Sequence, residues 1–472
     1  MLHRLNAVLL FVLMLAALSL QAQKTAYRIA VKIPGMSDTT CYLGRYYGDK
    51  QYVVDTARSD ATGLVVFEGK KMLEGGLYLF VFPDRRYFEF ILDRDRNITF
   101  ETQWDDPITH MKVKNSPDNE LFYAYLRQAI SLQQQSARLQ EQLQQAKSAA
   151  DSAAIRDQLR DLERQIVTYR DNYINQHPQT FLAKVFLAMK DPVIPEPWPV
   201  LANGRPDSTF PYRYYKAHYW DQVDLTDNRL LRTPVFAYRL KKYFDELVPK
   251  IPDSINVAAD QLIARARSDS EMYRYLVWWI TYTYETSKIM GMDAVFVHMT
   301  EKYYMNGSAW WVDSTTLAKM IDRARRIAPN LIGNTAPELA LRDTSGRLQV
   351  LSKIPARYTI LVFYDPDCGH CQQEVPKIKE AYQRWKDKGV AVFAVDIEVD
   401  TEKWKKFIRQ HQLDWINVSD PYHQSNFRQL YDVYSTPVIY ILDEQKKIRA
   451  KRIAADQIDE VLQHLSGIKE KS

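Results

Sequence analysis

The sequence predicts a multi-domain protein: a β-rich, sandwich-like N-terminal domain, an all-α middle domain and an α/β C-terminal domain. Three changes of pattern predict this order. Short alternating runs of apolar and polar residues fill residues 23–110, helical periodicity fills residues 111–328, and buried strands alternate with helices over residues 329–472. With 472 residues and a 46% hydrophobic composition, the chain can supply the cores of about three domains.

Residues 1–22 have the pattern of a secretory signal peptide. Arg4 lies in a basic head, and an apolar run extends from about Ala7 to Leu20. Ala22 followed by Gln23 offers a cleavage point. The run is short for a membrane-spanning helix, so the pattern predicts export and a periplasmic location. An uncleaved membrane anchor in the cell envelope is the alternative.

The N-terminal domain is predicted from runs such as "YRIAVKI", "LVVFEG", "LYLFVF" and "YFEFILD", which "PGMSD", "SDATG" and "EGG" separate. Alternation with period two, broken by turn residues at this spacing, predicts an antiparallel sheet or a small sandwich. Cys41 lies on one of the predicted strands. A lone Cys in such a place is typically a small buried hydrophobe.

The middle domain begins with a long segment rich in helix-forming residues. From about Asn119 the chain has no Pro or Gly until Pro178. Its apolar residues recur every three or four positions, which predicts two long helices that fold back on each other near residues 149–152. After the Pro-rich break "DPVIPEPWPV", further helices are predicted to about Ala328.

The C-terminal domain alternates strands with helices. "YTILVFYD" and "GVAVFAVDIE" are predicted strands, residues 369–388 and "TEKWKKFIRQH" are predicted helices, and "TPVIYILDEQKKIRAKRI" and "ADQIDEVLQHL" are predicted as a hairpin and a closing helix. Buried strands that alternate with helices predict a doubly wound sheet with at least one parallel pair. Active groups in such sheets collect beyond the carboxyl ends of the strands.

Cys368 and Cys371 lie at such a strand end, where "ILVFY" gives way to a helix. The unpaired N–H groups and the positive dipole at the start of a helix stabilise a thiolate. Cys368 is therefore predicted to attack a disulfide, and Cys371, one turn deeper, to resolve the mixed disulfide. Gly369 is expected to let the turn close tightly. His370 is expected to add positive charge that favours the Cys368 thiolate.

A metal site or a haem attachment site fits the cysteine pair less well than disulfide exchange does. A structural zinc site needs four ligands, and only His411 and His423 lie loosely downstream. Copper delivery would use the same thiols with a placed His. Haem attachment needs a His directly after the second Cys, where Gln372 stands. We therefore predict no metal and no cofactor beyond the redox-active disulfide Cys368–Cys371. A net charge of +5, with Lys and Arg scattered, predicts no nucleic-acid partner.

The segment "FYDPDCGHCQQEVP", with "APELALRDTSGRLQVLS" upstream, resembles the exported TlpA/ResA-like thiol-disulfide oxidoreductases of the thioredoxin superfamily. The resemblance covers roughly residues 330–470. Glu374 and Pro376 match the family's E-x-P, which implies that Glu374 faces the active-site cavity and that Pro376 kinks the helix. "YDVYSTPVIYILD" resembles the cis-proline segment, which implies that Thr436 and Pro437 flank the cysteines and present backbone to a bound peptide.

The domain order is also similar to that of exported Bacteroidetes proteins with a β-rich and a helical domain before a thioredoxin-like domain. The resemblance implies a periplasmic oxidoreductase that acts on protein disulfides or dithiols and is kept reduced by a membrane-bound thiol reductant, as in cytochrome c maturation. Gly-His between the cysteines resembles disulfide isomerases, so the reductase or isomerase direction is expected. The alternative is a non-enzymatic envelope scaffold or binding protein that carries a thioredoxin-like domain.

Two positions depart from related patterns. Val362 stands where cytosolic thioredoxins carry a buried Asp, so Glu374 is expected to be the internal proton acceptor. Asp365 stands where peroxiredoxins need a Thr, which argues against peroxidase activity.

Overall fold

A computed structural model describes residues 25–467 and divides into two compact units between Val248 and Pro249. The predicted signal peptide lies outside the described residues. The division falls inside the predicted all-α domain, and the boundaries predicted after residues 110 and 328 remain predictions. Within residues 25–467, no helix combines the length and the apolar character that crossing a membrane requires.

The N-terminal unit begins with two four-stranded sheets, of order β4-β1-β7-β8 and β3-β2-β5-β6. Their strands are β1 (Tyr27–Lys32), β2 (Thr40–Tyr47), β3 (Lys50–Arg58), β4 (Leu64–Gly69), β5 (Gly76–Val81), β6 (Tyr87–Leu92), β7 (Asn97–Glu101) and β8 (Lys112–Lys114). Aromatic rings from the two sheets meet in the core, where the Phe90 and Phe100 centroids are 5.2 Å apart. Cys41 on β2 is fully buried, as predicted.

One pairing differs from the predicted antiparallel arrangement, because β1 and β7 run parallel. Alternating sequence determines which face of a strand is buried, but it does not determine the neighbour or its direction.

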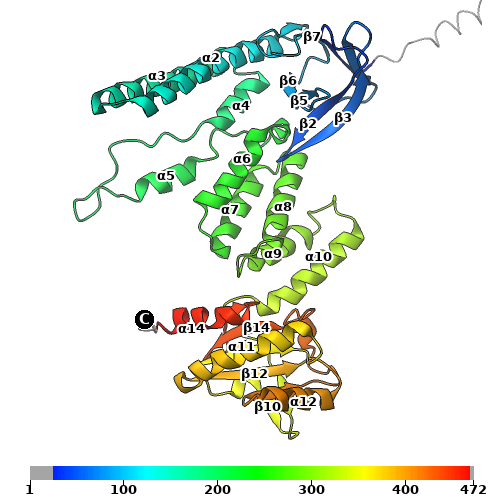
Figure 1. Cartoon of the computed structure of the whole chain (residues 1–472), viewed down its shortest axis with the longest axis vertical. Helices are drawn as coiled ribbons and strands as arrows, with labels where there is room; N and C mark the ends of the chain where they lie inside the picture. Colours follow the sequence, from blue (N-terminus) through cyan, green and yellow to red (C-terminus); the bar gives the residue numbers. More distant parts are fainter. Residues whose placement is uncertain (1–24, 468–472) are drawn as a thin grey trace, which may run out of the picture. The chain divides into compact units, whose positions relative to one another are not determined.

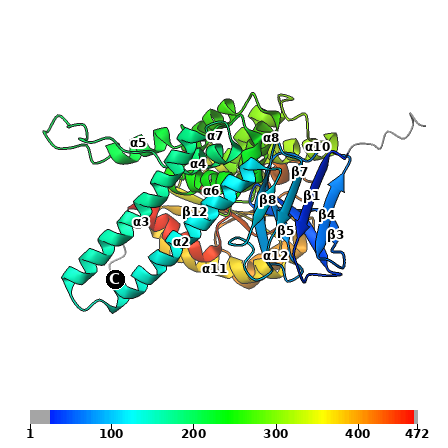
Figure 2. The same cartoon turned by 90° about the horizontal axis from the view of Figure 1, so that it is seen from above.

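Helices make up the rest of the N-terminal unit. They are α2 (Pro117–Gln145), α3 (Ala149–Gln176), α4 (Phe181–Met189), α5 (Phe210–His218), η1 (Asn228–Arg232), α6 (Pro234–Lys242) and η2 (Tyr243–Leu247). The long helices α2 and α3 lie side by side (Figures 1 and 2). Their connection lies at residues 146–148, where the Ser148 side chain accepts a hydrogen bond from the Asp151 N–H. The predicted reversal is therefore present, a few residues earlier than expected.

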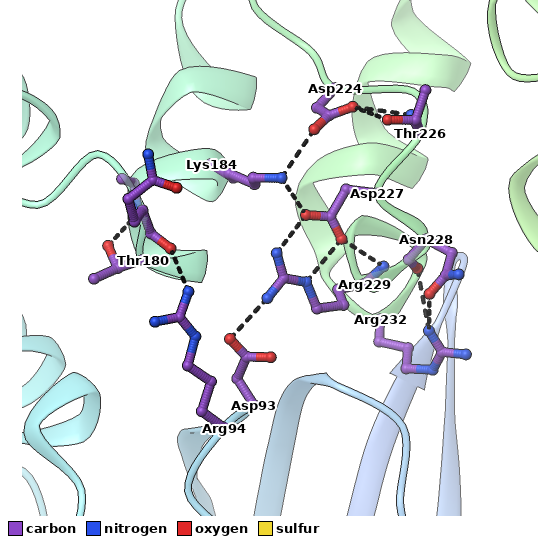
Figure 3. Close-up of polar contacts among 12 residues, drawn as sticks. Asp93, Arg94, Thr180, Lys184, Asp224, Thr226, Asp227, Asn228, Arg229 and Arg232 are labelled. Atoms are coloured by element: carbon purple, nitrogen blue, oxygen red, sulfur yellow. Dashed lines mark hydrogen bonds and ion pairs between the residues drawn. The ribbon is translucent and has the colours of Figure 1, made fainter. Parts of the chain in front are cut away.

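A charged network joins the sheets to these helices (Figure 3). Lys184 Nζ on α4 lies 2.8 Å from Asp227 Oδ2, and Arg229 Nη2 lies 2.5 Å from the same oxygen. Arg229 Nη1 reaches Asp93, just after β6, at 2.7 Å. Burial alone would raise the pKa of Asp227, but the bonds from Arg229 and Lys184 lower it to about 2. The network therefore holds the two parts of this unit together through paired charges.

The C-terminal unit starts with a helical segment. Its helices are α7 (Pro252–Arg265), α8 (Ser270–Glu285), α9 (Asp293–Met299), η3 (Thr300–Tyr304), α10 (Ser314–Ile327) and η4 (Ala328–Asn330). Leu276, Ile280 and Tyr284 recur at helical spacing along α8 and are buried, so they form part of the core.

The remainder is a seven-stranded sheet of order β10-β9-β13-β12-β11-β14-β15 with helices packed on it (Figure 1). Its strands are β9 (Ala340–Asp343), β10 (Leu348–Val350), β11 (Tyr358–Tyr364), β12 (Val390–Asp396), β13 (Ile416–Ser419), β14 (Val438–Asp443) and β15 (Ile448–Lys451). Its helices are η5 (Leu351–Lys353), α11 (Gly369–Trp385), η6 (Lys386–Lys388), α12 (Thr401–His411), α13 (Phe427–Leu430), η7 (Ala455–Gln457) and α14 (Ile458–Ser466).

Strands β11, β12 and β13 are parallel, while β14 pairs antiparallel with β11. Side chains of α11, α12 and α14 share one core cluster, and Phe427 of α13 belongs to the cluster on the other face. The predicted α/β domain is therefore present, with helices on both faces of one sheet. The parallel pairing brings the carboxyl ends of β11 and β12 to the same edge of the sheet.

The helical segment contacts this domain through a buried charge. Lys451 at the end of β15 has a side chain only 2% exposed, and its Nζ lies 2.6 Å from Asp293 Oδ2 of α9. The same Nζ donates to Asn330 Oδ1 at 2.6 Å. Burial lowers the pKa of Lys451 although Asp293 opposes that shift. The domain therefore depends on the helical segment to satisfy one of its own charges.

Candidate active site

The two close cysteines lie where β11 passes into α11. Cys368 is the N-cap residue of α11, and Cys371 is in its first turn. The Cys368 backbone N–H donates to the Asp365 carbonyl at 3.1 Å, which closes the connecting turn. Cys368 is partly exposed and Cys371 is fully buried, and both are free thiols in this structure. An accessible thiol at the helix start thus precedes a shielded one.

The pKa values of the two thiols shift in opposite directions. Burial alone would raise the pKa of Cys368, but hydrogen bonds from the backbone N–H groups of Cys371 and His370 and from the Thr436 side chain lower it below its usual value. Burial raises the pKa of Cys371 to about 12. Near neutral pH, Cys368 is therefore the better nucleophile.

The segment before β14 forms the other wall. The peptide bond between Thr436 and Pro437 is cis, as the family resemblance implies. The Cys368 thiol donates to the Thr436 carbonyl at 3.5 Å. Since Phe363 and Val438 are register partners in the sheet, Thr436 and Pro437 lie beside the end of β11. The structure therefore places these two residues next to the thiols, as predicted.

Glu374 lies in α11 but bonds away from the thiols. Its Oε1 accepts from Lys377 Nζ at 2.5 Å, and its Oε2 accepts from the Ala455 N–H at 3.1 Å. The hydrogen bond from Lys377 holds the pKa of Glu374 below its usual value. A carboxylate bonded in this way is a weak proton acceptor. Pro376 lies inside α11, as expected from the E-x-P match.

Gly369 and His370 lie between the two cysteines. A Cβ added at Gly369 would meet no side chain or distant backbone within 4 Å, and a role of this glycine in closing the turn stays a prediction. His370 is exposed, and its backbone N–H is the group that contributes to the lowered pKa of Cys368. A contribution of the imidazole to that shift stays a prediction.

A buried acid at the same edge was not singled out from the sequence. Asp396 is the last residue of β12 and is fully buried. Its register partner is Tyr364, whose hydroxyl accepts from Trp404 Nε1 at 3.0 Å. The sequence signal was present, since Asp396 lies near the carboxyl end of a predicted buried strand.

Within residues 25–467, no group of three or more His, Cys, Asp or Glu side chains is arranged to hold a metal ion. The arrangement described above offers a dithiol: one activated sulfur, one shielded sulfur behind it, and a backbone carbonyl beside the first.

Comparisons with known proteins agree with this geometry. Residues 332–451 match the AhpC/TSA family, and residues 27–122 and 192–330 match two domains of unknown function (DUF4369 and DUF5106). The thiol-disulfide oxidoreductase ResA of Geobacillus thermodenitrificans is 27% identical over 138 residues, which are 29% of this chain and 78% of that protein.

Two solved structures are also similar. The first, "a domain of possible thiol-disulfide isomerase" from Cytophaga hutchinsonii, is 43% identical and has a TM-score of 0.29. The match covers 30% of this chain and 96% of that one. The second, a thioredoxin-like protein from Bacteroides caccae, is 20% identical with a TM-score of 0.44, over 58% of this chain and 98% of that one.

Proposed function

Because the C-terminal domain of this chain belongs to the thioredoxin-like thiol-disulfide oxidoreductases, we propose that the protein exchanges disulfides with protein substrates through Cys368 and Cys371. The observation that carries this proposal is the placement of a partly exposed thiol, Cys368, at the start of α11 with a buried thiol, Cys371, in the first turn behind it. The opposite shifts of the two thiol pKa values agree with this placement. Efficient exchange needs one thiol that is a thiolate near neutral pH and a second thiol that waits behind it.

The exchange proceeds in two displacements. The Cys368 thiolate attacks one sulfur of a substrate disulfide, and the other substrate sulfur leaves with the bonding electron pair. Cys371 then loses its proton and attacks the Cys368 sulfur, which releases the second substrate sulfur. The substrate gains two electrons, and the Cys368–Cys371 disulfide forms. The cis Thr436–Pro437 segment presents backbone to the substrate peptide during these steps.

The direction of electron transfer and the cellular compartment are further parts of the proposal. We place the protein in the periplasm, exported by the N-terminal signal sequence, and we favour the reductase or isomerase direction. A membrane-bound thiol reductant would return the disulfide to the dithiol, and cytochrome c maturation is one process that needs such a reductase. Support comes from the sequence of residues 1–22 and from the similarity to ResA.

Insulin reduction tests the proposal. We expect the mature chain to reduce insulin with a dithiol as the electron source, which is followed by the turbidity of the released B chain. Cys368→Ser should abolish the activity. Cys41→Ser is the matched control, because Cys41 is buried in the N-terminal unit and should be dispensable. Undiminished activity of Cys368→Ser would contradict the proposal, and an inert wild-type chain would favour a scaffold or binding role.

A further inference from the structure

A cavity of about 280 Å³ lies where the helical segment of the C-terminal unit meets the α/β domain. Its helical side is formed by residues 284–293, at and after the end of α8, and by Arg323 of α10. The domain side is formed by Asp432 and Tyr434, which precede the cis-proline, and by Lys451 and Arg452 at the end of β15. Small-molecule sites usually exceed about 300 Å³, so this cavity suits a side chain of a bound peptide.

The cavity is close to the thiols along the chain. Tyr434 lies two residues before Thr436, whose carbonyl accepts from the Cys368 thiol at 3.5 Å. Two residues of extended chain span at most about 7 Å, so the backbone of Tyr434 lies within about 7 Å of Thr436. A substrate peptide that binds against Thr436 in extended form rises about 3.3 Å per residue. A side chain two to four positions from the substrate cysteine can therefore enter the cavity.

Arg452 holds the domain side of the cavity in one arrangement. Its Nη1 donates to the Tyr434 hydroxyl at 3.0 Å, and its guanidinium carbon lies 4.9 Å from the centroid of the Tyr434 ring. Its Nη2 donates to the Asp432 carbonyl at 2.7 Å and pairs with the Asp432 carboxylate. Tyr434 nevertheless remains 65% exposed. A fixed and accessible aromatic ring therefore stands beside the cis-proline.

The lining has a surplus of positive charge, with four cationic and three acidic side chains. Each acid faces a cation of the same cavity: Asp293 lies 2.6 Å from Lys451, Asp432 pairs with Arg452, and Glu285 lies 3.6 Å from Arg323. Lys288 is exposed and has no ion-pair partner within residues 25–467. An entering group therefore meets an excess of positive charge, which favours an anion.

Arg323 is the cation best placed to bind that anion. The 3.6 Å between its Nε and Glu285 Oε1 is too long for a hydrogen bond. Among the described residues, its guanidinium has no hydrogen-bond partner, and its side chain is 48% exposed. Its guanidinium carbon lies 5.9 Å from the ring centroid of Phe296 on α9. The planar guanidinium thus keeps its donors for a carboxylate, whose two oxygens match them.

We propose that this cavity receives an acidic side chain of the substrate protein, two to four positions from the substrate cysteine. Arg323 binds the carboxylate, and the ring of Tyr434 packs against the carbon atoms of the same side chain. This inference rests on the proposed function, because it names the class of substrate segment that the thiols act on. The helical segment thereby takes part in the choice of substrate.

Peptides that carry one cysteine as a mixed disulfide with thionitrobenzoate test this inference. The Cys368 thiolate of the reduced full chain attacks the peptide sulfur, and thionitrobenzoate leaves with the bonding electron pair. Its absorbance gives the second-order rate constant. The peptides differ only in the residue three positions from the cysteine on either side, which is Glu, Gln or Lys.

In the wild type, the Glu peptide should react about fivefold faster than the Gln peptide, which is the upper range for an ion pair at a partly exposed site. The Lys peptide should react more slowly than both. At about 1 M salt the Glu-to-Gln ratio should fall, because the charges are screened.

Arg323→Gln should lower the Glu-to-Gln rate ratio to less than about two, and Arg323→Glu should invert it. Both substitutions change a half-exposed side chain, so the fold should be kept. Arg325→Gln is the matched control, because Arg325 is exposed on the same helix and lies outside the cavity lining. It should keep the wild-type ratio. Since both Gln variants lose one charge, the comparison separates a local contact from attraction by the net charge of +5.

Equal rates for the Glu and Gln peptides in the wild type would overturn the inference and leave the proposed function intact. A Glu-to-Gln ratio in Arg323→Gln that matches the ratio in Arg325→Gln would do the same. Thionitrobenzoate release that is absent in the wild type, or that persists in Cys368→Ser, would instead overturn the proposed function.

Discussion

Two substitutions at His370 separate its imidazole from its backbone. In the structure, the backbone N–H of His370 contributes to the lowered pKa of Cys368, and the side chain is exposed. His370→Ala removes the imidazole and keeps the N–H. His370→Pro removes both, and proline is tolerated in the first turn of a helix, so α11 should still form.

The expected magnitude follows from one lost hydrogen bond to a charged sulfur, which is worth about 1.5 kcal/mol. That free energy corresponds to about one pKa unit and to about 30 mV for a two-electron couple. His370→Pro should therefore raise the pKa of Cys368 by about one unit. Since the thiolate belongs to the reduced form, its loss of stabilisation should lower the reduction potential by about 30 mV. His370→Ala should change either quantity by less than half as much.

The assay is thiolate ultraviolet absorbance across pH, together with redox titration against glutathione, on all three proteins. Equal shifts in His370→Ala and His370→Pro would show that the imidazole, and not the backbone N–H, stabilises the Cys368 thiolate. A reduction potential that rises in His370→Pro would contradict the expected direction of the shift.

The remaining predictions concern the thiols and the domain contact. With a pKa of about 12, Cys371 is ionised in about one molecule in 10⁵ at pH 7. Iodoacetamide should therefore label Cys368 at least about a thousandfold faster than Cys371, as measured by mass mapping of the modified peptides. Equal labelling rates would exclude Cys368 as the attacking thiol. Asp293→Asn should lower the free energy of unfolding of the C-terminal unit in urea by about 3 kcal/mol, because it leaves the buried charge of Lys451 without its ion-pair partner. Lys451→Met and the double variant should lower it by about 1 kcal/mol or less, because Asp293 is partly exposed. A Lys451→Met variant that loses as much stability as Asp293→Asn would contradict this expectation. The fragment 330–472 should fold and reduce insulin but unfold at lower urea than fragment 249–472; equal midpoints would show that the contact is dispensable.

Local signals in the sequence were sufficient for much of the C-terminal domain. Helix α12 has the predicted bounds, because Asp400 accepts from the N–H groups of Glu402 and Lys403 and the apolar positions have helical spacing. Strands β11 and β12 were evident as β-branched apolar runs. The close pair of cysteines at a strand end, and the proline beside it, were also readable from the chain.

Features that depend on distant partners were not predictable. The four-residue strand β13 has too short a pattern to detect, although β12 and β9 pair with it on either side. The parallel pairing of β1 with β7 depends on the choice of neighbour, which alternation does not encode.

The candidate site shows the same limit. The bonds of Glu374 to Lys377 and Ala455 could not be inferred from the motif match. Asp396 is an ordinary strand-end acid in sequence, and only the register with Tyr364 places it beneath the thiols. The ion pair of Lys451 with Asp293 could not be predicted, because the two residues are more than a hundred positions apart in the sequence.

Trapping the mixed-disulfide intermediate shows directly whether Cys368 attacks the substrate and Cys371 resolves the mixed disulfide. The Cys371→Ser chain is incubated with insulin, and the covalent adduct is mapped by mass spectrometry under non-reducing conditions. We expect a stable mixed disulfide on Cys368, and no adduct when Cys368→Ser is treated in the same way. An adduct that maps to Cys371 in Cys368→Ser, with none on Cys368 in Cys371→Ser, would contradict it.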